Sequence, residues 1–172
     1  MGAPEIRLRR PTEEDAEGLL PLWRSPEVRR YLGGPCDEAG ARERFEDLLA
    51  TWREHGFGYE VVEVEGRPGP AGLCGFAHAD YEPERPIELA YMFFPDVWGT
   101  GVARAAAELA LARRAEFGIT DPVAMAQLEN VRSRRLLMRL GFEETEVVVR
   151  FGERQQRFRL PPTAAGVADT QP

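Results

Sequence analysis

One stretch of the sequence restricts the fold more than any other. An apolar run over residues 87–94 is followed, across two glycines, by an alanine-rich run over residues 98–117. The first run predicts a buried strand, and the second predicts a long helix that ends at Gly118. Gly99 and Gly101 carry no side chains, so a phosphate can approach the backbone N–H groups and the positive end of the helix dipole. The stretch therefore predicts a phosphate-binding turn between a strand and a helix.

Neither common nucleotide motif fits this turn. A Rossmann dinucleotide site needs a third glycine where Arg104 stands, and an acidic residue at the end of the next strand, whereas Asp121 precedes that strand. A P-loop needs Gly-Lys-Ser/Thr, which the chain lacks. A glycine pair between a strand and a helix can also be only a turn. If a ligand binds here, we expect a diphosphate held in another way.

The rest of the chain predicts a mixed α/β domain with helices on both faces of one sheet. Helices are expected over residues 12–24, 25–32, 38–54 and 131–140, and strands over 6–9, 58–65, 72–79, 123–128, 145–151 and 155–160. The last two strands form a hairpin, as do the second and third. A proline-containing loop covers residues 81–86. Residues 1–160 are expected to form a single domain, followed by a disordered tail over 161–172.

Composition excludes several classes of protein. The formal net charge of -7 argues against a nucleic-acid partner. The two cysteines, Cys36 and Cys74, and the two histidines show no zinc-site spacing, so no metal is expected. No apolar run approaches the roughly 20 residues that span a bilayer. The short, charged start does not resemble a secretion signal, and we expect a cytoplasmic protein with no membrane partner.

The run Trp98, Gly99, Thr100, Gly101, Val102, Ala103 resembles the acetyl-CoA pyrophosphate loop of the GNAT superfamily of N-acetyltransferases, Arg/Gln-x-x-Gly-x-Gly/Ala. Trp98 replaces the usual first residue, which is typical of the branch that contains the ribosomal-protein alanine N-acetyltransferases. Asn130 and Ser133, followed by Leu140, Gly141 and Phe142, resemble the Asn-x-x-Ser…Leu-Gly-Phe ending of that branch. Residues 7–15 and 25–28 resemble its opening, so the similarity covers residues 5 to 160.

The resemblance implies a twisted, mostly antiparallel sheet that splays between its fourth and fifth strands. The pantetheine arm of acetyl-CoA would lie in the gap and pair with backbone near Tyr91, Met92 and Phe93. The acceptor pocket would lie between the first two helices and the last hairpin. The remaining residues that it assigns to the coenzyme are Trp98, Gly99, Thr100, Gly101, Val102, Ala103, Arg104, Asn130, Ser133 and Leu137.

The same resemblance makes Ser133 the candidate that protonates the departing CoA thiolate, because Leu137 stands where many GNAT enzymes carry a tyrosine. A general base is less evident. Glu88 and Glu146 are the candidates, with His78 and Asp80 as further alternatives, and each could equally be a solvent-facing strand residue. Asn130 and Ser133 could also serve only to cap a helix.

The predicted function is acetyl transfer from acetyl-CoA to a primary amine. The acceptor is either the α-amine of a protein N-terminus or a small-molecule amine, such as a polyamine or an antibiotic. The alternative is an acyl-CoA-binding module without catalysis that serves as a sensor or an assembly part. A homodimer is left open, since enzymes of this kind often dimerise.

Overall fold

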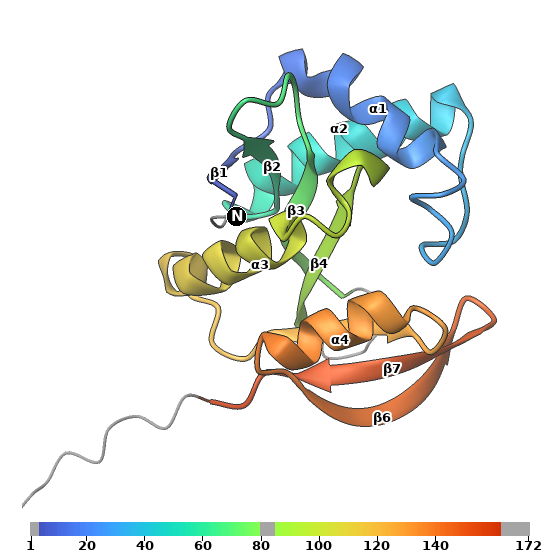
Figure 1. Ribbon diagram of the computed structural model, residues 1–172, viewed down its shortest axis with the longest axis vertical. Coiled ribbons are helices and arrows are strands. Elements are labelled where there is room, and N and C mark those ends of the chain that lie inside the picture. Colours follow the sequence, from blue (N-terminus) through green and yellow to red (C-terminus); the bar gives the residue numbers. More distant parts are fainter. Residues whose placement is uncertain (1–3, 80–84, 163–172) are drawn as a thin grey trace, which may run out of the picture.

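The computed structural model describes residues 4–79 and 85–162. A seven-stranded sheet runs through the molecule in the order β1-β2-β3-β4-β5-β7-β6 (Figure 1). Neighbouring strands are antiparallel, except that β4 and β5 are parallel. The strands are β1 (Ile6–Arg9), β2 (Tyr59–Val64), β3 (Gly72–His78), β4 (Ile87–Phe93), β5 (Val123–Gln127), β6 (Glu143–Arg150) and β7 (Glu153–Arg159).

Helices cover both faces of this sheet, as predicted. The consecutive residues Val61 and Val62 of β2 are both 0% exposed, yet their side chains belong to two different apolar clusters. Val61 packs with α1 (Ala16–Arg24) and α2 (Glu38–His55), while Val62 packs with α3 (Val102–Arg113). The cluster that contains Val62 also contains Leu137 of α4 (Val131–Arg139), so α3 and α4 share one core.

The sheet opens between its fourth and fifth strands. β4 pairs with β5 at a single position, Glu88 with Val123, although β4 continues to Phe93. β3 accompanies β4 over its whole length on the other side. The second half of β4 therefore has a strand on only one side, which confirms the predicted splay (Figure 1).

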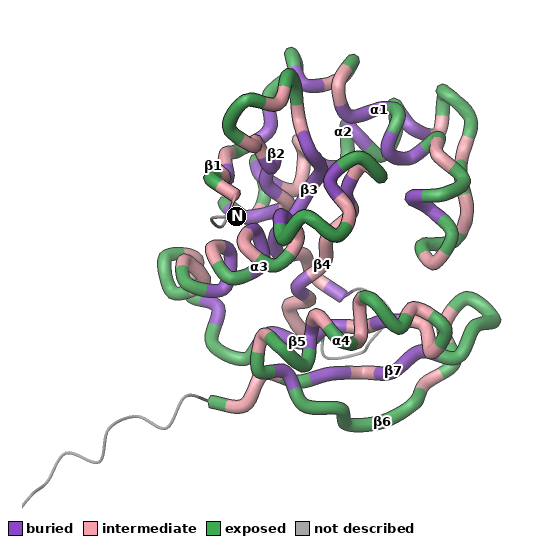
Figure 2. Tube along the Cα trace, in the orientation of Figure 1, coloured by how far each residue is buried: buried purple, intermediate pink, exposed green. Residues whose placement is uncertain are grey.

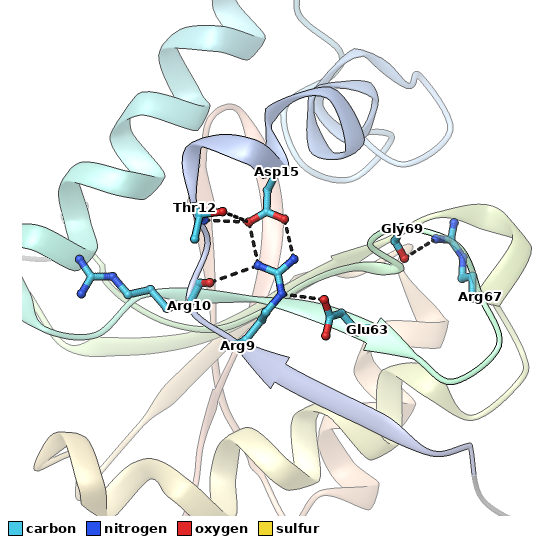
Figure 3. A network of polar contacts seen from close by, with 7 residues as sticks. All are labelled: Arg9, Arg10, Thr12, Asp15, Glu63, Arg67 and Gly69. Atoms are coloured by element: carbon cyan, nitrogen blue, oxygen red, sulfur yellow. Dashed lines mark hydrogen bonds and ion pairs between the residues drawn. The ribbon is translucent and has the colours of Figure 1, made fainter.

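A polar network fixes the passage from β1 into α1 (Figure 3). Arg9 lies 2.6 Å from Asp15 and 2.6 Å from Glu63 of β2. Burial alone would raise the pKa of Asp15, but hydrogen bonds from Arg9 and from the Thr12 backbone N–H hold that pKa below its usual value. Asp15 thus stays ionised at neutral pH and closes a short 3-10 turn, Glu13–Asp15, before α1. This network lines an open cavity of about 620 Å³.

The helix expected over residues 25–32 is wrong. Residues 26–33 form successive turns, in which the backbone N–H groups of Leu32 and Gly34 both donate to the Arg29 carbonyl. Gly33 and Gly34 adopt left-handed φ angles of 84° and 82°. Val28 and Arg29 are buried in these turns, so tertiary packing has overridden local helix propensity.

Other boundaries shift by a few residues. The helix expected from residue 98 begins at Val102, and its last turn, Arg114–Phe117, is a 3-10 helix. Both strands of the last hairpin begin two residues earlier than expected. Residues 81–84 of the expected loop, and all of the expected tail except residues 161 and 162, lie outside the described residues.

Candidate active site

The predicted phosphate-binding turn is a rigid loop that ends in a helix start. The Trp98 indole donates a hydrogen bond of 2.9 Å to the Phe93 carbonyl, and the Thr100 hydroxyl donates one of 2.7 Å to the Val97 carbonyl. Gly99 and Gly101 have φ angles of 78° and 92°, which favour glycine. Two side chains and two glycines thus hold the loop in shape.

Free backbone donors follow this loop. The first N–H that bonds within α3 is that of Ala105, which donates to the Gly101 carbonyl. The N–H groups of Val102, Ala103 and Arg104 therefore precede the helical ladder, as at any helix start. Val102 turns its side chain into the core, and the Arg104 guanidinium pairs with Glu108 at 2.7 Å on the outside of α3. The space beside Gly99 is open, since an added Cβ there would meet nothing within 4 Å.

The backbone of β4 faces the gap at alternate residues. A Cβ on Gly72 would overlap the Met92 carbonyl, so Met92 directs its backbone to β3 and not to the gap. In an antiparallel pair the backbone groups of successive residues point to alternate sides, so those of Tyr91 and Phe93 face the gap. The Phe93 carbonyl already accepts the Trp98 indole bond. Tyr91 is then the residue whose backbone best fits an extended ligand.

Across the gap, Ser133 is held at the start of α4. The Asn130 side-chain oxygen accepts a hydrogen bond of 3.2 Å from the Ser133 backbone N–H, so Asn130 caps the helix. The Ser133 hydroxyl lies 2.9 Å from the hydroxyl of Tyr91. Burial raises the pKa of Tyr91 well above its usual range, and the Ser133 hydrogen bond opposes that only in part. Tyr91 is therefore a neutral donor or acceptor at neutral pH.

The Tyr91 hydroxyl is a site group that the sequence pattern does not single out. Its partner lies 42 positions further along the chain, beyond the reach of any local motif. The only available signal is strand alternation, which places Tyr91 on the same side of β4 as Leu89 and Phe93. These two side chains belong to the core that α3 and α4 share.

The candidate bases occupy very different places. Glu88 borders the gap at the one position where β4 meets β5; its side chain is 13% exposed and lies 3.5 Å from the Arg150 guanidinium. Glu146 lies on the edge strand β6, separated from β4 by β5 and β7, with its side chain 64% exposed. The structure therefore does not bring Glu146 to the gap. His78 stacks against His55 at 4.7 Å, and Asp80 lies outside the described residues.

Leu137 is a predicted coenzyme residue whose side chain lies in the core, as do those of Phe93 and Val102. Its side chain is 1% exposed and packs with Ala124, Phe142 and Phe158. It anchors α4 to the sheet and so fixes where Ser133 stands. Within residues 4–79 and 85–162, no three metal-binding side chains gather into a cluster. The helices in those two ranges include none with the length and apolarity to cross a membrane.

Comparisons with known proteins agree with this arrangement. The family model described as "Acetyltransferase (GNAT) domain" matches residues 5–143. The uncharacterized N-acetyltransferase YoaA of Bacillus subtilis (strain 168) is 26% identical over 144 residues, which are 82% of this chain and 81% of that protein.

Two solved structures share the fold. An acetyltransferase of Agrobacterium tumefaciens strain C58 superposes with a TM-score of 0.78 at 21% identity, covering 92% of each chain. The spermidine N-acetyltransferase of Vibrio cholerae, solved with CoA and spermine, superposes with a TM-score of 0.75 at 18% identity, covering 90% of this chain and 94% of its own. With the family model spanning most of the chain, this protein belongs to the GNAT acetyltransferase family and is an N-acetyltransferase.

Proposed function

We propose that the gap between β4 and β5 binds acetyl-CoA and that the acetyl group passes directly to a primary amine. The observation that carries this proposal is the loop with Gly99 and Gly101 in left-handed conformations, which leads into the free N–H groups of α3. These donors and the helix dipole suit a diphosphate. The pantetheine arm would pair with the Tyr91 backbone as an added strand. The Vibrio cholerae relative, which holds CoA, supports the choice of coenzyme.

The Tyr91–Ser133 hydroxyl pair supports a route for the leaving group. The neutral amine attacks the thioester carbonyl, and the tetrahedral intermediate collapses with cleavage of the C–S bond. Ser133 donates its proton to the thiolate and regains one from Tyr91, 2.9 Å away. The amine proton passes to a base or to water, and Tyr91 regains a proton from solvent, so the transfers balance. The net products are the acetylated amine and CoA with a free thiol.

Glu88 is the candidate that accepts the amine proton, directly or through water. It borders the gap, whereas Glu146 lies two strands away on the sheet edge. An α-amine has a pKa of about 8, so a fraction is already neutral near pH 7 and a weak base suffices. Both a protein N-terminus and a small-molecule amine meet this condition.

The test is thiol release from acetyl-CoA with a panel of N-terminal peptides, amino acids, polyamines and aminoglycosides. We expect Ser133→Ala to lower kcat on the order of 100-fold and Tyr91→Phe to lower it about 10-fold, with CoA affinity unchanged. The double variant should be no slower than Ser133→Ala, because the two hydroxyls act in series. Thr51→Ala removes a hydroxyl that bonds only its own helix α2 and should match the wild type.

Two results would count against the proposal. CoA binding with no acetyl transfer to any amine would favour a sensor or assembly module without catalysis. Absence of CoA binding would overturn the assignment of the gap. Sedimentation of the same samples would show whether the protein forms a homodimer.

A further inference from the structure

Arg29 is a buried cation that lacks a counter-ion among the described residues. Only 8% of the residue is exposed, in the turns between α1 and α2. Its Nε donates to the Gly34 carbonyl at 3.0 Å, which uses one of the five N–H donors of a guanidinium. Its two amino groups bond no described residue, and no described carboxylate pairs with them. Burial lowers the pKa of Arg29, and the positive charge of Arg44 lowers it further.

A buried guanidinium of this kind lowers the stability of the fold unless an anion from outside the chain pairs with it. A buried charge without a partner destabilises a fold, and most buried arginines are therefore paired. Asp15, Glu60 and Glu88 show the usual solution in this protein, since each has an arginine beside it. Arg29 departs from that pattern within the described chain.

The amino groups of Arg29 are open to a ligand. Neither nitrogen belongs to the fully buried, unbonded side-chain atoms of the described residues, so solvent reaches both. Arg44 on α2 is exposed, and its charge acts on the same spot. Figure 2 shows the loop between α1 and α2 as largely exposed, with a short buried stretch that corresponds to Val28 and Arg29. Arg29 thus has a second cation near it and no described acid paired with it.

The position of Arg29 relates it to the gap. Its neighbour Val28 packs in the α1–α2 cluster together with Met92 and Phe94, at the end of β4. Tyr91, which reaches Ser133, packs on the opposite face of β4. In the proposed mechanism the leaving sulfur lies on the Ser133 side, so we expect the amine to approach from the other face of β4, against which the segment that carries Val28 and Arg29 packs.

We propose that Arg29, assisted by Arg44, binds an oxyanion of the acceptor, so that the acceptor is a small amine that also carries a carboxylate or a phosphorus oxyanion. This inference rests on the proposed function for the amine half of the ligand. A guanidinium presents paired donors that match a carboxylate or phosphate in two-point contact. A polycationic amine such as spermidine would instead meet two like charges.

The first arm of the test is turnover with matched acceptors. L-amino acids are compared with their amides, 2-aminoethylphosphonate with ethanolamine, and spermidine serves as the polycation. We expect the wild type to prefer the acid-bearing member of each pair by about 10-fold or more in kcat/KM. Arg29→Gln should raise KM for that member by a similar factor, with kcat little changed and the amides unaffected. The control Arg30→Gln removes an exposed arginine of the same loop, which stacks on Tyr31, and should leave the preference intact.

The second arm needs no turnover. Inorganic phosphate is titrated calorimetrically into the protein, without and with saturating CoA. Without CoA the proposed diphosphate loop can also bind phosphate, so the site of interest is the one that remains with saturating CoA. We expect that site to be lost in Arg29→Gln and weakened in Arg29→Lys, which keeps the charge without the paired donors. The Arg29→Lys variant also serves if Arg29→Gln does not fold.

Three results would overturn the inference: equal use of acids and amides by the wild type, phosphate binding that survives in Arg29→Gln with saturating CoA, or complete loss of phosphate binding when CoA saturates the wild type. The last result would mean that the phosphate had occupied the coenzyme site and not a separate acceptor site. If no amine is acetylated but phosphate binds through Arg29, the proposed function fails while the anion site stands.

Discussion

Gly101 joins the phosphate loop to α3 with a φ angle of 92°, and Gly118 leaves the far end of the same helical segment with a φ angle of 69°. Alanine in this left-handed region costs about 1–2 kcal/mol. An added Cβ has room at both positions, since the nearest atom to that of Gly101 is 3.6 Å away and none lies within 4 Å of that of Gly118. Replacing either glycine by alanine should therefore cost a similar free energy of unfolding. The two glycines differ mainly in that only Gly101 lies at the proposed diphosphate site.

We expect Gly101→Ala and Gly118→Ala to lower the free energy of unfolding by similar amounts, about 1–2 kcal/mol. Only Gly101→Ala should weaken CoA binding, by about 10-fold or more, because its methyl group and the altered loop stand at the helix start that receives the phosphates. Denaturant unfolding and calorimetric CoA titration measure the two effects. Equal CoA affinity in both variants would contradict the proposal that the diphosphate binds at this loop.

The start of helix α4 is capped by Asn130, and the same residue fixes the position of Ser133. Asn130 caps the helix through its side-chain oxygen, and Leu137 ties it to β5, β7 and Phe142. Ser133 is therefore set by a local bond at the helix start and by core packing one turn later. The amide NH₂ of Asn130 makes no bond among the described residues, which leaves it available to a ligand.

Replacing Asn130 separates the cap from the proposed coenzyme contact. Asn130→Asp keeps the accepting oxygen and adds a charge that suits a helix start, so stability should be retained. Its loss of the NH₂ donor should weaken acetyl-CoA binding about 10-fold. Asn130→Ala should in addition lower the free energy of unfolding by about 1 kcal/mol.

Asp37 caps α2 in the same way, through the Gly40 N–H at 2.8 Å. Asp37→Ala should cost about 1 kcal/mol without a change in CoA affinity, and it is the matched control. Thermal unfolding and calorimetry give both quantities. If Asn130→Asp binds acetyl-CoA like the wild type, Asn130 serves only as a cap.

The whole molecule is held together by a core that crosses the opening in the sheet. One apolar cluster contains Leu89 and Phe93 from β4, Ala107 from α3, and Leu137 and Phe158 from the part beyond the gap. The backbone pairing of β4 with β5 is limited to one position, so side chains and not the ladder connect the two parts. We expect a single cooperative unfolding transition.

A coenzyme bound in the gap should stabilise both parts together. At a concentration about 100 times its Kd, acetyl-CoA should raise the free energy of unfolding by about 2.7 kcal/mol and shift one transition upward. Calorimetric scans with and without the coenzyme check this, with Gly101→Ala as the variant that should respond less. Two transitions, of which acetyl-CoA shifts only one, would contradict the shared core.

Local chemistry made much of this protein predictable. Helix α2 was expected over residues 38–54 and is observed as Glu38–His55, because Asp37 caps its start and Gly56 ends it in a left-handed turn. The strands follow from alternation, and the phosphate turn follows from Gly99 and Gly101. The helix predicted over residues 25–32 failed, since burial of Val28 and Arg29 outweighed propensity.

The sequence alone therefore predicted most helices and strands, the family and the turn at Gly99 and Gly101, since each depends on residues close together in the chain. Tertiary structure alone decided that Tyr91 meets Ser133 across 42 positions, that Met92 turns its backbone to β3, and that Glu88 rather than Glu146 borders the gap. These outcomes depend on which strands pair and in which register. No local pattern encodes that choice, because it is made by the packing of segments far apart in the chain.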